Sequence, residues 1–164
     1  MSFPKYTDKT KSGVDWLGDV PTHWRVVRLR RVAELNPSKS EVSELDRELP
    51  VSFLPMEAIG DDGTLNLEHT RAIGSVESGY TYFREGDVTI AKITPCFENG
   101  KGAIMQGLLH EIGFGTTELI VARPLSEYTT SSFLHWLFMS TYFRRFGEST
   151  MYGAGGRNEF PITL

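Results

Sequence analysis

The chain has 164 residues, 40% of them hydrophobic and 12% aromatic, so it can bury a hydrophobic core and is neither disordered nor fibrous. Its net charge of −4 argues against a protein that coats nucleic acid indiscriminately. The charge is uneven, because residues 36–70 carry a net charge of −6 and the remainder a net charge of +2. A local basic face is therefore compatible with the sequence.

In the amino-terminal part, residues 1–20 are predicted to be partly flexible, because the chain begins with a polar stretch. Leu29, Val32 and Ala33 recur at helical spacing, which predicts a helix that ends at Asn36-Pro37. The start of the chain lacks the apolar core of a signal peptide. No stretch approaches the ~20 unbroken apolar residues that a membrane helix needs.

Short strands dominate the middle of the predicted fold. Residues 38–50 are acidic and predict a surface loop or a short helix, and residues 51–54 are a candidate strand. The segment 87–93 has an alternating pattern, and 102–105 is a short second strand. Residues 118–122 are richer in apolar side chains, which predicts a central strand.

The carboxy-terminal part predicts a long helix. Thr129 or Thr130 can cap a helix that runs to about Phe146, with Gly147 as its stop. Its apolar residues cover more than one stripe, which indicates burial on two sides. Together these elements predict a fold of the α/β (α+β) class, a twisted mixed β-sheet with flanking helices, in a single domain over residues 1–164.

A polar loop follows the predicted strand that ends near Lys92. Lys92, Thr94, Asn99 and Lys101 gather in it around a proline and a glycine. Base edges in the DNA major groove are bound by these types of side chain, with Lys on guanine, Asn on adenine and Thr through its hydroxyl or methyl group. The alternative is that Thr94 and Asn99 satisfy the backbone of a turn.

Two further loops supply candidate contacts. Thr116 and Thr117 follow two glycines and precede the predicted central strand, where they could contact phosphates or bases. A Gly-rich loop at residues 153–157 could wrap a phosphate with backbone N–H groups and Arg157, and Asn158 follows directly. This loop lacks the spacing of a Walker motif.

The sequence offers little support for catalysis. Cys96 is the single cysteine, so no internal disulfide can form, and a reducing, cytoplasmic compartment is the economical prediction. A nucleophile–base pair of Cys96 with His110 or His135 is the disfavoured enzyme alternative. The four histidines and one cysteine show no metal-ligand spacing.

Three blocks of the sequence resemble one known family. They are Ser12–Leu29, Gly86–Ile104 together with Gly113–Pro124, and Gly153–Leu164 (GAGGRNEFPITL). The central block, GDVTIAKITPCFENGKGAI followed by GFGTTELIVARP, is the most specific of them. They are similar to the amino-terminal target-recognition domain of type I restriction–modification specificity (S) subunits, and the chain stops where that family's first spacer helix would begin.

This resemblance implies a domain that reads one half of a bipartite double-stranded DNA site for methylation (M) and restriction (R) subunits. It implies no catalysis and no cofactor on this chain, with S-adenosylmethionine, ATP and Mg on the partner subunits. The alternative from a different class is a protein-interaction module that docks through Trp16, Trp24 and the apolar helix at residues 133–146. The sequence leaves a homodimer open.

Overall fold

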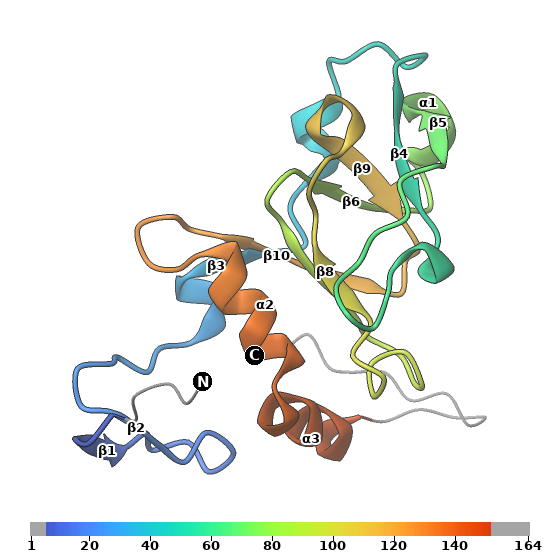
Figure 1. Ribbon diagram of the computed structural model, residues 1–164. Coiled ribbons are helices and arrows are strands. Elements are labelled where there is room, and N and C mark those ends of the chain that lie inside the picture. The colour runs from blue at the N-terminus through green and yellow to red at the C-terminus, as the bar shows by residue number, and fades with distance from the viewer. Residues whose placement is uncertain (1–5, 152–164) are drawn as a thin grey trace.

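The computed structural model describes residues 6–151, in which most strands belong to two four-stranded sheets (Figure 1). The first, which we call the central sheet, has the order β3-β10-β7-β8, and every neighbouring pair in it is antiparallel. Its strands are β3 (Ala33–Leu35), β7 (Val88–Ala91), β8 (Gly102–Ile104) and β10 (Leu119–Pro124).

The second, which we call the mixed sheet, has the order β5-β4-β9-β6. Strands β4 and β9 run parallel, whereas the other two pairs are antiparallel. Its strands are β4 (Pro50–Leu54), β5 (Thr70–Ala72), β6 (Thr81–Arg84) and β9 (Ile112–Gly115). The α+β class and the mixed sheet with flanking helices are confirmed, with the strands divided between two sheets.

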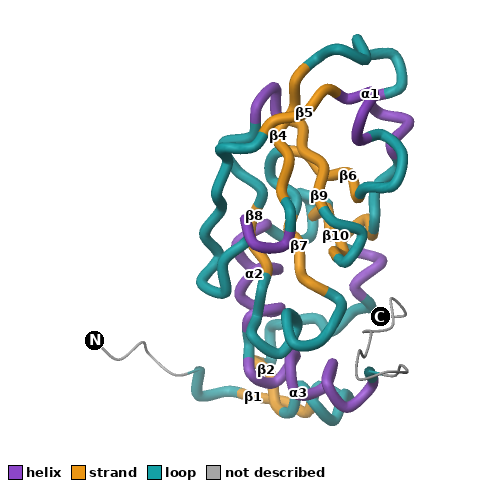
Figure 2. The backbone as a smooth tube through the Cα atoms, turned by 90° about the vertical axis from the view of Figure 1, so that its right-hand side faces the viewer, coloured by secondary structure: helices purple, strands orange, loops and turns teal. Residues whose placement is uncertain are grey.

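Helices and a small hairpin complete the described part. The α-helices are α1 (Ile73–Val76), α2 (Ser131–Met139) and α3 (Thr141–Thr150). Single 3₁₀ turns are η1 (Leu29–Arg31), η2 (Lys39–Val42), η3 (Met56–Ala58) and η4 (Leu109–Glu111). Strands β1 (Lys9–Lys11) and β2 (Asp19–Pro21) pair antiparallel, so part of the amino-terminal segment is a hairpin. Figure 2 shows this hairpin and α3 at one end of the molecule and the mixed sheet toward the other.

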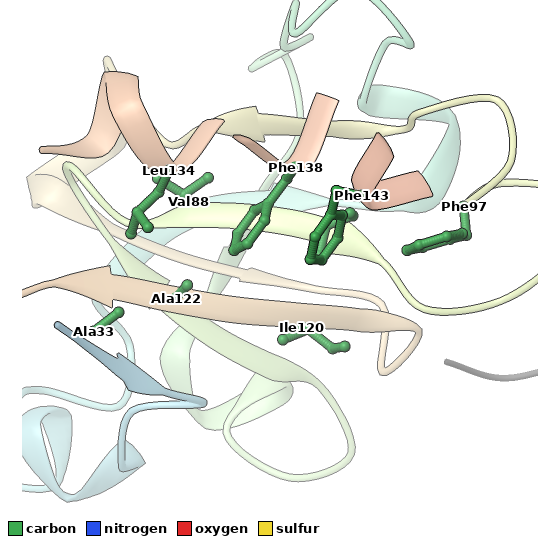
Figure 3. Packing of buried hydrophobic residues seen from close by; sticks show 9 residues of the cluster. Ala33, Val88, Phe97, Ile120, Ala122, Leu134, Phe138 and Phe143 are labelled. Carbon is green, nitrogen blue, oxygen red and sulfur yellow. The ribbon is translucent and has the colours of Figure 1, made fainter. Parts of the chain in front are cut away.

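The hydrophobic core explains why β10 is central. Helix α2 lies over β7, β8 and β10, and it buries Leu134 and Phe138 against Val88 (Figure 3). A second buried cluster, which includes Val121, Leu54 and other residues of both sheets, fills the space between the sheets. Strand β10 is buried along most of its length and lies between β3 and β7, as its apolar composition predicts.

Sequence periodicity gives one wrong element in the amino-terminal part. The helix predicted from Leu29, Val32 and Ala33 is a single 3₁₀ turn followed by β3. Strand β3 pairs with the end of β10, so the backbone hydrogen bonds of Ala33–Leu35 belong to a sheet. Long-range strand pairing therefore overrides a weak three-residue helical pattern.

The long carboxy-terminal helix is interrupted at Ser140. The backbone of Ser140 is extended (φ −64°, ψ 141°), and its side-chain oxygen accepts a hydrogen bond from the N–H of Phe143. Ser140 therefore caps α3, and the prediction of one continuous helix is wrong. Gly147 is buried inside α3, so it is not the stop either. Among residues 6–151, no helix has the length and apolar character needed to cross a bilayer.

Candidate nucleic-acid interface

An open groove of about 240 Å³ brings together residues from the mixed sheet, the central sheet and the segment after β3. Two of the residues that line it, Lys92 and Thr117, are predicted DNA contacts from different loops. The lining includes two lysines and no acidic side chain. We call it the recognition groove and define it by its lining residues, which are Asn36, Pro37, Lys39, Tyr80, Thr81, Tyr82, Lys92, Thr117 and Leu119.

Antiparallel pairing of β7 with β10 explains why Lys92 and Thr117 meet. Ala91, the last residue of β7, pairs with Leu119, the first residue of β10. Just beyond, the N–H of Lys92 donates to the carbonyl oxygen of Glu118 (2.8 Å). The residue after one strand and the residues before the other are thereby held at the same edge of the central sheet.

The neighbouring Thr116 contributes to the turn itself. Its side-chain oxygen accepts a hydrogen bond from the N–H of Glu118 (3.2 Å), and its own N–H donates to the carbonyl oxygen of Leu54 (3.3 Å). Thr117, in contrast, is exposed. The structure therefore favours Thr117 over Thr116 as a residue that can reach a ligand.

The loop between β7 and β8 is tightly closed. The N–H of Asn99 donates to the carbonyl oxygen of Pro95 (3.0 Å), while the Asn99 side chain is exposed. Phe97 is fully buried in the core beside α3, and Arg144 of α3 donates to the carbonyl oxygen of Glu98 (3.2 Å). The loop is thus anchored at its middle by the core and by α3, and it presents Asn99 outward. Thr94 is half-buried.

Lys101 has a structural contact that its sequence context does not reveal. Its Nζ donates to the carbonyl oxygens of Met56 (3.1 Å) and Ile59 (3.0 Å). Both acceptors belong to the turn that follows β4, so this lysine ties the central sheet to the mixed sheet. Because two of its three donor hydrogens are used in this way, the predicted DNA contact of Lys101 stays a prediction that competes with a structural role.

Sequence reasoning missed Lys39 and Tyr80, which also line the recognition groove. The Nζ of Lys39 donates to the carbonyl oxygen of Glu77 (2.9 Å), which fixes the lysine beside the mixed sheet. Both residues are far from the predicted loops in sequence, and no local motif links them to Lys92. The predicted contacts Arg157 and Asn158 lie outside the described residues.

A charged network, buried except at Glu41, lies directly behind the groove. Arg123 of β10 donates to both carboxylate oxygens of Asp87 (2.8 and 2.9 Å) and to Glu41 (2.6 Å). Tyr82 of β6 lines the groove and donates its hydroxyl to the same Glu41 (2.9 Å). The network therefore joins the two sheets at the position where they form the groove.

The network also shifts the titration of its members. Burial opposes the charge of Glu41, but hydrogen bonds from Tyr82 and Arg123 and the charge of Arg123 outweigh it, so the pKa of Glu41 is lowered. Burial and the adjacent Glu41 raise the pKa of Tyr82 to about 12. The pKa of Arg123 is raised, because its carboxylate partners outweigh the cost of burial. These groups are held in their usual ionisation states at neutral pH.

The structure also locates the residues of the enzyme and protein-docking alternatives. Cys96 is half-buried in the β7–β8 loop, and no group of three His, Cys, Asp or Glu side chains within residues 6–151 is arranged to hold a metal ion. Trp16 and Phe146 are both half-buried, and their rings stack on each other with centroids 5.3 Å apart. Trp136 is 72% exposed, so α2 is buried on one side and open on the other.

Comparison with known proteins identifies relatives of this chain. No protein-family profile matches the chain. Two curated Escherichia coli proteins match over 145 residues: the type I restriction enzyme EcoAI specificity subunit at 45% identity and the EcoEI specificity subunit at 40%. Each match covers 87% of this chain and 24% of the relative. The chain thus spans about a quarter of the length of these relatives.

Solved structures show the same fold at lower identity. The crystal structure of the HsdS subunit from Thermoanaerobacter tengcongensis has a TM-score of 0.61 and 23% identity, covering 83% of this chain and 34% of that one. A chain from a study of assembly and conformational transition of the type I R-M system has a TM-score of 0.57 and 22% identity, covering 73% of this chain and 30% of that one. The described part is therefore an α+β domain of the kind found in these subunits. By sequence, the chain is a homologue of type I restriction enzyme specificity subunits.

Proposed function

We propose that this chain is a sequence-specific DNA-binding module that reads one half of a bipartite target in a type I restriction–modification system. The observation that carries the proposal is the convergence of Lys92 and Thr117, from two separate loops, on one groove without acidic lining. The relationship to specificity subunits supports the same assignment.

The chemistry of base recognition suits the exposed Asn99 and Thr117 and the half-buried Lys92. Lys92 can donate to guanine O6 or N7, the Asn99 amide can pair with adenine, and Thr117 can offer its hydroxyl or methyl group. Lys101 is a weaker candidate because its Nζ donates to two carbonyl oxygens, and Thr116 because its oxygen is used in a turn. Thr94, half-buried like Lys92, stays a predicted contact. Arg157 and Asn158 would add phosphate or base contacts from the last part of the chain.

Specificity subunits are non-catalytic and carry no cofactor of their own. In our proposal this chain supplies the sequence specificity for double-stranded DNA, in the cytoplasm. The M subunits bring S-adenosylmethionine, and the R subunits bring ATP and Mg. Because this chain spans about a quarter of its curated relatives, its assembly with M and R subunits belongs to the proposal.

The test is selection of bound sequences from a pool of random duplex DNA, with the 164-residue chain immobilised. We expect one short motif to be enriched. A triple variant, Lys92→Ala, Asn99→Ala and Thr117→Ala, should lose the motif while unfolding at the same urea concentration as the wild type. The matched control replaces Lys9, Thr10 and Lys11, exposed residues of the β1–β2 hairpin at the far end of the molecule, and should enrich the wild-type motif. A pool without enrichment for the wild-type chain would refute sequence-specific binding.

A second candidate function, protein docking, is supported by an exposed aromatic patch. Trp136 and Phe133 of α2 are 72% and 46% exposed, and Trp24 makes an edge contact with Phe133 at 5.8 Å between centroids. Such a patch is typical of interaction surfaces. Sedimentation of the wild type and of Trp136→Ser at micromolar concentrations tests it: self-association that the variant loses would support docking between copies, and a monomer at all concentrations would refute the homodimer.

A further inference from the structure

The cationic surface around the recognition groove extends beyond the residues predicted from sequence. Arg71 of β5 is exposed, and its guanidinium lies 4.0 Å from the centroid of the Phe53 ring and 5.9 Å from that of Tyr80. Tyr80 itself lines the groove. Arg71 therefore flanks the groove on the side of the mixed sheet, and the two aromatic rings hold its planar group in place.

Acidic side chains close to this surface are engaged elsewhere. Glu77, whose carbonyl oxygen accepts the Lys39 bond, directs its carboxylate to Arg47 (2.6 Å). Glu41, behind the groove, is bound to Arg123 and Tyr82. The positive charges of Lys39 and Arg71 are thus not paired with these neighbouring carboxylates, so they can attract an anion.

Two of the polar but uncharged lining residues, Asn36 and Tyr82, are already hydrogen-bonded within the fold. The side-chain oxygen of Asn36 accepts a hydrogen bond from the N–H of Val121 (2.9 Å), and the hydroxyl of Tyr82 is donated to Glu41. Neither group is therefore free to offer the oriented donor and acceptor pair that reading a base edge requires. What the groove offers to a ligand is mainly positive charge on long side chains.

We propose that the recognition groove seats the sugar–phosphate backbone of one DNA strand, with Lys39 and Arg71 as phosphate contacts. This inference rests on the proposed function and adds that separate residues contact the DNA backbone and the bases. Lys39 and Arg71 would set the position of the module on the duplex, whereas Asn99 and Thr117 at the loop tips would meet the bases. Lys92, at the junction of groove and loop, would take part in either contact.

The experiment measures binding of fluorescent duplexes by anisotropy over a series of salt concentrations. One duplex carries the motif recovered by selection, and the other is a scrambled duplex of the same composition. Lys39→Gln and Arg71→Gln should each weaken binding about five- to tenfold on both duplexes alike. Each should also lower the slope of log affinity against log salt by about 0.9, the value for one lost phosphate contact on B-DNA.

Two further variants serve as controls. Lys11→Gln removes one positive charge from the distant hairpin and should leave affinity and slope unchanged. Arg71→Lys keeps the charge and gives up only the planar stacking on Phe53, so it should keep the wild-type slope. If Arg71→Gln does not fold, which a thermal melt will show, Lys39→Gln still tests the idea.

The outcomes separate the two proposals. If the wild type selects a motif but Lys39→Gln and Arg71→Gln bind as Lys11→Gln does, the backbone assignment is overturned and the proposed function stands. A loss confined to the selected duplex, with an unchanged salt slope, would also overturn it, because that result indicates base contacts. If the wild type shows no sequence preference at all, the proposed function itself has failed.

Discussion

Replacement of Asp87 by Asn is expected to lower the free energy of unfolding by about 3 kcal/mol, at the lower end of the range for breaking a buried ion pair. Asp87 is only 1% exposed and accepts two hydrogen bonds from the Arg123 guanidinium and one from the N–H of Arg84. The variant leaves Arg123 buried with one carboxylate, Glu41, at 2.6 Å. Because that partner remains, the cost should stay below the ~5 kcal/mol of a fully orphaned charge.

Urea unfolding followed by tryptophan fluorescence is the assay, run as a double-mutant cycle with Arg123→Met. Each single variant leaves one partner without its counterpart, whereas the double variant removes the ion pair altogether. We therefore expect the double variant to cost less than the two single variants added together, by about 1–3 kcal/mol. Additive costs, or a loss below about 1 kcal/mol for Asp87→Asn, would refute the view that this buried pair stabilises the fold.

An exposed ion pair in the same molecule provides the matched control. Arg47 and Glu77 are 2.6 Å apart, slightly closer than Arg123 and Asp87 at 2.8 Å, but the side chain of Arg47 is 66% exposed. Removal of Arg47 should change stability by no more than about 1 kcal/mol, since solvent screens such pairs. The contrast between the two pairs tests whether burial, rather than the short distance, makes the network important.

Three further changes test other parts of the fold. The pKa of Glu41 is lowered from 4.5, so its ionised form stabilises the fold above that pH. This contribution is lost as the pH falls through the lowered pKa. The difference in urea midpoint between the wild type and Glu41→Gln should therefore shrink below pH 4.5. Lys101→Met should cost about 2 kcal/mol in the same assay, because two charged hydrogen bonds are lost, and an unchanged midpoint would contradict the structural role. Gly113→Ala should lower stability by about 1–3 kcal/mol, since the added methyl group would overlap the buried Phe83 ring, and a thermal melt equal to that of the wild type would exclude the overlap.

Much of the strand content could be predicted because it depends on local pattern. Residues 51–54, 102–105 and 118–122 are strands or nearly so, and the most apolar of them is the central strand, as expected. The helix after Thr130 begins where its capping threonine predicts. The break between α2 and α3 also had a local signal, because Ser140 is a residue type that caps helices and Thr141 begins the next helix. The apolar residues on both sides of Ser140 nevertheless favoured the prediction of one continuous helix.

The groove could be predicted only in part. The strands that bring Lys92 and Thr117 together are adjacent and antiparallel. The sequence could therefore predict that the two polar loops lie at one edge of the sheet. Lys39, Tyr80 and Arg71 belong to the mixed sheet or to the segments that lead into it. The position of this sheet depends on the parallel pairing of β4 with β9. Such long-range pairing leaves no periodic trace in the sequence, so these residues could not be linked to the site.

The two lysines of the β7–β8 loop show why residue type alone does not assign a role. Lys92 lines the groove, whereas Lys101 donates to the turn at residues 56–59 and so joins the central sheet to the mixed sheet. The Arg123 network makes a second polar connection between the same two sheets. Two such connections fix the spacing of Lys39 and Lys92 before any DNA is bound, which reduces the ordering cost of binding. If the chain binds DNA as proposed, Arg123 variants should weaken that binding without touching DNA, with the salt slope of the wild type. A Lys101 variant with the wild-type slope would favour its structural role over the predicted DNA contact.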